Sequence, residues 1–258
     1  MKILFIADIV GTPGRKAVEE RLPSLLEELE VDFCVANGEN VADGVGITPK
    51  LADRLLATGI DAITLGNHVW RRVEIVPYLT GSDRVVRPAN LGKAAPGKGL
   101  AVVTARDGTR VAVLNVMGSL FLDVPVSMWE IVDDLVAEAL RKTQVIFVDV
   151  HAEATSEKVA LARWLDGKAT AVIGTHTHVQ TNDARVLPGG TAALSDAGMT
   201  GPHDSVIGVR SELALKRMRT GLPVRFETAA GDVRIEGALI ECDAQGRASS
   251  CTTIRVPV

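Results

Sequence analysis

Residues 2–8 read Lys-Ile-Leu-Phe-Ile-Ala-Asp, a short apolar run that ends on an acid, and this run predicts the first strand of the protein. The segments that follow alternate in character. Residues 15–29 and 49–57 have the spacing of helices, the second beginning after the N-cap Thr48, and residues 31–36 and 61–65 have the composition of strands. This alternation predicts a parallel sheet, because each helix crosses over from one strand to the next.

The pattern changes after residue 100. Residues 100–116 predict two strands joined by the turn Asp107-Gly108, which is typical of an antiparallel hairpin. Helical spacing returns at 127–141, 156–165 and 209–219, with strands at 145–150 and 169–173 and a turn at Thr200-Gly201-Pro202. We therefore predict an α/β fold with a mixed, two-sheet core and flanking helices, as one domain over residues 1–258.

Composition narrows the class of protein. Of the 258 residues, 47% are hydrophobic, which is enough to bury a large core without disulfides. The three cysteines, Cys34, Cys242 and Cys251, lack metal-type spacing and are expected to be reduced thiols. A formal net charge of −4 argues against broad binding to a nucleic-acid backbone. No stretch suits a signal peptide or a membrane span, so we expect a cytoplasmic protein without a membrane partner.

Side chains of the kinds that bind metals follow successive predicted strands. They are Asp8, the pair Glu39-Asn40, the pair Asn67-His68, His151, and the segment His176-Thr177-His178. Each of them alone is explained as well by an ordinary turn or a structural histidine. Parallel strands, however, bring their carboxyl ends to one edge of the sheet, where open α/β folds hold their active sites. The sequence therefore predicts one metal site at this edge.

The segment His176-Thr177-His178 is the strongest local signal for metal. Residues two apart on an extended segment face the same side of the backbone. We therefore expect the two imidazoles to bind one metal or two neighbouring metals.

Four blocks of the sequence resemble the signature blocks of the metallophosphoesterase superfamily. The superfamily has Asp-x-His, Gly-Asp, Gly-Asn-His and Gly-His-x-His, and this chain has Asp8-Ile9-Val10, Gly38-Glu39-Asn40, Gly66-Asn67-His68 and residues 174–178. Val10 in place of a histidine and Glu39 in place of an aspartate are departures. Together with residues 7–11 (Ala-Asp-Ile-Val-Gly) and 196–202 (Asp-Ala-Gly-Met-Thr-Gly-Pro), these blocks resemble the YmdB-like family of bacterial phosphodiesterases over nearly the whole chain.

This resemblance implies an αββα sandwich that hydrolyses 2′,3′-cyclic nucleotides at a centre of two divalent metals. Glu39 would bridge both metals. Asp8, Asn40 and His178 would complete the first ligand set, and Asn67, His151 and His176 the second, while His68 would stay free. These donors are imidazole nitrogens and hard oxygens without a thiolate, which suits iron, manganese or zinc. The residue types do not choose among the three metals.

The charge of such a centre favours an anionic phosphodiester. Two divalent cations and the carboxylates of Asp8 and Glu39 leave a charge of about +2. Metals roughly 3.5 to 4 Å apart can hold a bridging hydroxide as the nucleophile. The leaving oxygen then needs a proton, and His68 is our candidate for the general acid because it adjoins a ligand without being one. A purely structural role for His68 is the alternative.

Two classes of function stay open at this point. The first is a phosphodiesterase, and the second is a regulatory protein that keeps the two-metal site to bind a nucleotide or a protein partner and turns over slowly. The expected substrates are small phosphodiesters or cyclic nucleotides, or the ends of RNA. We also expect the chain to form homo-oligomers, of a size that the sequence does not define.

Overall fold

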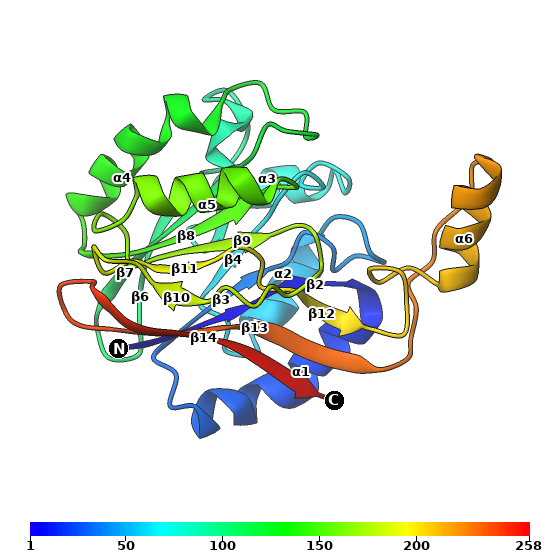
Figure 1. Ribbon diagram of the computed structural model, residues 1–258, viewed down its shortest axis with the longest axis horizontal. Coiled ribbons are helices and arrows are strands. Elements are labelled where there is room, and N and C mark those ends of the chain that lie inside the picture. Colours follow the sequence, from blue (N-terminus) through cyan, green and yellow to red (C-terminus); the bar gives the residue numbers. More distant parts are fainter.

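Two β-sheets form the centre of the protein in the computed structural model, which describes residues 1–258 (Figure 1). The first sheet has the strand order β2-β12-β13-β1-β3-β4-β5, with β14 paired to β13. Its strands are β1 (Lys2–Ile6), β2 (Asp8–Ile9), β3 (Phe33–Asn37), β4 (Ala62–Thr64), β5 (Val85–Val86), β12 (Met199–Pro202), β13 (Val233–Cys242) and β14 (Ala248–Pro257).

The second sheet has the strand order β10-β11-β9-β8-β7-β6. Its strands are β6 (Leu100–Thr104), β7 (Arg110–Met117), β8 (Val145–His151), β9 (Ala171–Thr175), β10 (Arg185–Val186) and β11 (Ala192–Leu194). The helices are α1 (Gly11–Glu28), α2 (Pro49–Leu56), α3 (Ile75–Gly81), α4 (Val132–Leu140), α5 (Thr155–Trp164) and α6 (Ser211–Thr220), with short 3₁₀ helices at Ala89–Leu91 and Met128–Glu130.

The alternating first third of the chain forms the predicted parallel pairing. Strand β1 pairs in parallel with β3, β3 with β4, and β4 with β5. Helices α1 and α2 make the crossovers between β1, β3 and β4. The Thr48 side chain accepts a hydrogen bond from the Leu51 amide at 3.3 Å, so the predicted N-cap of α2 is confirmed.

The predicted hairpin opens the second sheet. Strands β6 and β7 pair antiparallel, and the Asp107 carboxylate accepts a hydrogen bond from the Thr109 amide at 2.8 Å in the turn between them. From β7 onward the pairing becomes parallel through β8, β9 and β11. The expected helix at 127–141 is divided, because Met128–Glu130 forms a 3₁₀ turn before α4 begins at Val132.

The two sheets pack face to face with helices on both outer sides. Ile3 and Phe5 of β1 enter a core cluster between the sheets, where the ring of Phe5 lies 5.1 Å from that of Phe147, centroid to centroid. Leu4 and Ile6 point the other way into a cluster with α1, α2 and α3, as the two-residue period of a strand requires. A third cluster joins the second sheet to α4 and α5. The predicted αββα sandwich is therefore confirmed (Figure 1).

The predicted turn at Thr200-Gly201-Pro202 is wrong, because these residues belong to β12. Met199 and Thr200 pair in parallel with β2, and Gly201 and Pro202 pair with β13. Glycine and proline usually mark turns, but here pairing with β2 and β13 holds these residues in a strand. Helix α1 packs closely on this strand, because a β-carbon at Gly14 would overlap the carbonyl oxygen of Thr200.

Helix α6 projects from the body of the sandwich (Figure 1). Its side chains Leu215 and Met218 are 53% and 74% exposed.

The predicted homo-oligomer stays a prediction. None of the helices combines the length and the apolar character needed to cross a membrane. All three cysteines are free, and their side chains are buried.

Close packing of β13 against β1 generates a prediction about stability. A β-carbon at Gly237 would overlap the carbonyl oxygen of Phe5, and this backbone atom cannot move without breaking the pairing of the two strands. We expect Gly237→Ala to lower the free energy of unfolding by about 3 kcal/mol in urea denaturation, the cost of overpacking a core. The control is Gly81→Ala in α3, where a β-carbon has open space. If both variants unfold at the same urea concentration, the packing argument fails.

Candidate metal centre

The strand ends meet at one edge of the sandwich, and the predicted side chains form one connected network there. The Asn40 amide nitrogen lies 3.4 Å from both Asp8 Oδ1 and Glu39 Oε1, and 3.2 Å from His178 Nε2. His151 Nε2 lies 3.2 Å from Glu39 Oε1, 2.8 Å from Asn67 Oδ1 and 3.1 Å from His176 Nδ1. The network thus joins all the predicted ligands, which are Asp8, Glu39, Asn40, Asn67, His151, His176 and His178.

The network has two halves joined by one carboxylate. Asp8 and His178 gather around Asn40, while Asn67 and His176 gather around His151. Glu39 Oε1 contacts both halves and is almost completely buried. This division parallels the two ligand sets that the resemblance implies, and the assignment of ligands to metals stays a prediction.

The donor set fits a transition-metal ion. One ligand atom each from Glu39, His151 and His176 lies within 4.8 Å of the other two. The set combines imidazole nitrogen with carboxylate oxygen and contains no thiolate, as iron, manganese and zinc sites do. A group of Glu and His side chains with the composition and spacing of a candidate metal site is therefore present at this edge.

Burial and charge compete in this cluster. Burial disfavours ionised Glu39, but the imidazoles of His151 and His68 outweigh it and hold the pKa of Glu39 well below its usual range. Burial likewise disfavours the imidazolium of His151, yet Glu39 raises the pKa of His151 to about 9. Burial and the charge of His151 together lower the pKa of His176 to about 3. The same acidic surroundings that hold a proton on His151 favour a divalent cation, and a cation bound there would displace that proton.

The turn after β9 corrects one expectation. The segment of His176 and His178 is not extended, because both residues have positive φ, 100° and 63°. Each such residue costs about 1–3 kcal/mol and persists only where the surroundings enforce it. The two imidazoles consequently do not share one side as neighbours on a strand. His176 contacts His151 and His178 contacts Asn40, so each serves a different half of the network.

His68 lies at the rim of the network. Its amide donates to Glu39 Oε2 at 2.8 Å, and its Nδ1 lies 2.7 Å from Asn40 Oδ1. The side chain remains 27% exposed, whereas those of Glu39 and His151 are almost completely buried. The fifth histidine, His203, contacts the Met199 carbonyl oxygen and lies outside the network.

A buried carboxylate beneath the network was not predicted from the sequence. Asp149 of β8 accepts hydrogen bonds from the side-chain amide of Asn37 at 3.0 Å, from the Thr175 hydroxyl at 2.6 Å, and from the Thr64 hydroxyl. The Thr175 hydroxyl also contacts His151 Nδ1 at 2.9 Å. The backbone amide of Glu39 donates to Asn37 Oδ1 at 3.1 Å. Burial raises the pKa of Asp149 to about 6. The available signal was a polar residue inside an apolar strand, Val-Ile-Phe-Val-Asp-Val-His at 145–151.

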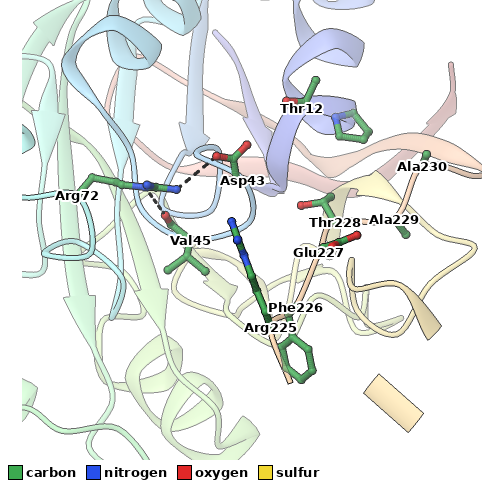
Figure 2. A pocket seen from close by; sticks show the side chains of 11 residues that line it. Thr12, Asp43, Val45, Arg72, Arg225, Phe226, Glu227, Thr228, Ala229 and Ala230 are labelled. Atoms are coloured by element: carbon green, nitrogen blue, oxygen red, sulfur yellow. Dashed lines mark hydrogen bonds and ion pairs between the residues drawn. The ribbon is translucent and has the colours of Figure 1, made fainter. Parts of the chain in front are cut away.

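A cavity of about 740 Å³ lies between the first turn of α1, the loop of Asp43 and Val45, and residues 225–230. Figure 2 shows Arg225 reaching toward the loop of Asp43 and Val45, which Arg72 holds from the other side with hydrogen bonds to both residues. Thr12 and Thr228 line the same cavity. None of the network residues lines this cavity. The first turn of α1, which carries Thr12, is joined to the network by the Gly11 amide, which donates to the Asn40 carbonyl oxygen at 2.9 Å.

The contacts of Asp149 predict a loss of stability on substitution. An asparagine at this position would replace one acceptor oxygen by an amide donor that faces the donors of Asn37, Thr64 or Thr175. We expect Asp149→Asn to lower the free energy of unfolding by about 1–3 kcal/mol in urea denaturation. The matched control is Asp107→Asn in the exposed hairpin turn, with an expected change within about 0.5 kcal/mol. Equal stability of the two variants would contradict the role of Asp149.

Comparisons with known proteins identify relatives over nearly the whole chain. The sequence profile of the family described as YmdB-like protein matches residues 4–254. A 2′,3′-cyclic-nucleotide 2′-phosphodiesterase of Bacillus subtilis (strain 168) is 48% identical over 245 residues, which cover 95% of this chain and 92% of the relative.

Two crystal structures share the whole fold. A Thermus thermophilus protein described as hypothetical is 40% identical, with a TM-score of 0.93 over 100% of this chain and 99% of that one. A protein of Mycoplasma pneumoniae described as a novel phosphatase is 29% identical, with a TM-score of 0.92 over 100% of this chain and 93% of that one. The family profile spans nearly all of the chain, and the chain therefore belongs to the YmdB-like family.

Proposed function

We propose that this protein is a metal-dependent phosphodiesterase that hydrolyses 2′,3′-cyclic nucleotides. The observation that carries the proposal is the connected network of carboxylate, amide and imidazole donors around Glu39. It occurs in a chain that is 48% identical to a Bacillus subtilis protein named as a 2′,3′-cyclic-nucleotide 2′-phosphodiesterase. An RNA chain that ends in a 2′,3′-cyclic phosphate presents the same ring and is a second candidate substrate.

The network is proposed to hold two divalent cations, iron, manganese or zinc. Asp8, Asn40 and His178 would hold one and Asn67, His151 and His176 the other, with Glu39 between them. Such cations supply Lewis acidity and lower the pKa of bound water toward neutrality. The two buried carboxylates, Asp8 and Glu39, leave the loaded centre positive by about +2, which favours an anionic phosphodiester.

Asn40 and His68 are proposed to control the proton for the leaving oxygen. Asn40 now turns its amide nitrogen toward Asp8 and His178 and its oxygen toward His68. To act as a general acid His68 would have to be the imidazolium and return to the neutral imidazole, so both of its nitrogens would carry a hydrogen. Asn40 Oδ1, 2.7 Å from Nδ1, can accept one of these hydrogens. The hydrogen on Nε2 is then the one that would pass to the leaving oxygen.

The cavity around Arg225 is the proposed site for the nucleoside. Arg225 is exposed and makes no ion pair within the chain, so its guanidinium is available to a phosphate or a base. Phe226 lines the same cavity and carries Arg217 over its ring at 5.5 Å. A single aromatic side chain of this kind gives stacking with little choice among bases.

The proposed activity predicts selectivity for the ring that is opened. On protein whose metals have been counted, we expect metal-dependent hydrolysis of 2′,3′-cyclic AMP to exceed that of 3′,5′-cyclic AMP and of a generic phosphodiester. Added Mn²⁺ or Fe²⁺ is expected to restore activity after chelation. Two bound metals with no turnover of any of the three substrates would instead support a regulatory protein that keeps the site for binding.

The role of His68 is tested separately. We expect His68→Ala to retain its metals and to lower kcat about 10²- to 10⁴-fold, the range of general acid–base catalysis, with a smaller change in KM. His203→Ala is the matched control, since the imidazole of His203 lies outside the network. Its polar contacts are the Met199 carbonyl oxygen at 3.2 Å and Glu236 Oε2 at 3.9 Å. Metal content is measured by elemental analysis for both variants. An unchanged kcat in His68→Ala would remove the acid assignment.

A further inference from the structure

A buried ion pair lies behind the turn that carries His176 and His178. Lys158 of α5 places Nζ 2.7 Å from Asp196 Oδ2, and the two side chains are 1% and 2% exposed. Neither residue belongs to the predicted ligands. Removing two charges from water costs free energy that their attraction must offset, so a pair buried this deeply calls for an explanation beyond stability.

Asp196 does more than neutralise Lys158. Its Oδ2 also accepts hydrogen bonds from the Thr177 amide at 3.1 Å and from the Thr177 hydroxyl at 2.8 Å, and its Oδ1 accepts from the Gly198 amide at 2.9 Å. Thr177 is the residue between the two histidines. The carboxylate therefore holds the centre of the turn by two contacts, while Lys158 holds the carboxylate.

The turn requires such a hold. His176 and His178 both have positive φ, a backbone conformation that residues other than glycine seldom adopt. Thr177 lies between them and has no positive φ. Fixing Thr177 at both its amide and its hydroxyl determines the direction of the chain on either side, and with it the directions of both imidazoles.

The strand that leads into the turn is fitted to the same pair. A β-carbon at Gly174 would overlap the Ser195 carbonyl oxygen and lie 2.8 Å from Lys158 Cδ. Because Gly174 has no side chain, the Ser195 carbonyl group and the aliphatic part of the Lys158 side chain can pack against its backbone. Helix α5 and the 195–198 segment therefore meet directly beneath the turn.

We propose that Lys158, Asp196 and Thr177 form a positioning clamp that orients His176 and His178 for metal before any metal binds. His176 lies in the half of the network around His151, and His178 in the half around Asn40, so the clamp acts on both proposed metal positions at once. The inference rests on the proposed function for the metals themselves. It assigns a task to Asp196, the first residue of the Asp-Ala-Gly-Met segment, and to Lys158.

Thr177→Val is the primary test, because valine keeps the size of the side chain and leaves the buried ion pair intact. Groups that orient metal ligands are worth about 10–100-fold in metal affinity. We expect Mn²⁺ to bind the metal-free variant at least tenfold more weakly than the wild type in calorimetric titration. A second readout needs no metal: the Thr177 amide is expected to exchange its hydrogen faster in Asp196→Asn than in the wild type.

Asp166→Asn is the control. Asp166 Oδ2 accepts a hydrogen bond from the Gly189 amide at 2.9 Å, a carboxylate-to-turn contact of the same kind in the turn between β10 and β11, away from the two histidines. We expect this variant to bind Mn²⁺ as the wild type does.

Asp196→Asn leaves the buried Lys158 ammonium without its carboxylate and is expected to be less stable than the wild type. Asp196→Asn combined with Lys158→Met therefore supplies a variant without an unpaired charge.

The outcomes separate the clamp from the proposed function. A wild type that binds two Mn²⁺ and a Thr177→Val variant that binds them equally well would overturn the clamp alone. A wild type that binds no Mn²⁺, iron or zinc would overturn the two-metal function, and the clamp with it. Weaker Mn²⁺ binding in Thr177→Val, unchanged binding in Asp166→Asn and faster exchange at Thr177 in Asp196→Asn would support the clamp.

Discussion

The buried carboxylate of Asp149 is the contact on which the arrangement of the site depends. It accepts hydrogen bonds from Asn37 of β3 and Thr64 of β4 in the first sheet and from Thr175 of β9 in the second. Apolar packing between the sheets is not directional, so it does not fix how the strand ends lie relative to one another. Directed hydrogen bonds across the sheet interface do, because each donor left without its acceptor would be a buried unsatisfied group.

The network of proposed ligands is built directly on these contacts. The Thr175 hydroxyl, which donates to Asp149, also contacts His151 Nδ1 and so orients the imidazole. The Asn37 side chain accepts a hydrogen bond from the backbone amide of Glu39. Two carboxylates beneath the site, Asp149 and Asp196, thus hold the residues that lie beside the proposed ligands. This order of support is typical of metal sites, in which the partners of a ligand decide its direction and basicity.

The same edge of the sandwich concentrates strain and charge. His176 and His178 adopt positive φ, and Asp8 and Glu39 are carboxylates almost fully removed from water. Such features lower stability unless the surroundings compensate, and they collect where function requires them. Here histidines supply the compensating positive charge to Glu39, and the same acidic surroundings favour a divalent cation. The hydrogen bonds of Asp196 to Thr177 hold the strained turn in place.

The sequence by itself determined strands β1, β3, β4 and β6 to β9, five of the six helices and the residues of the network. Strands buried on both faces give continuous apolar runs, as in Val145–His151, and the polar residues that follow such runs mark the edge of the sheet. Local patterns could not show that Thr200-Gly201-Pro202 pairs as β12, or that His176 and His178 leave the extended conformation. They also could not show the partners of Asp149 and Asp196, which lie up to 112 residues away in the chain. Those features depend on which strands become neighbours, and only the packing of the two sheets decides that.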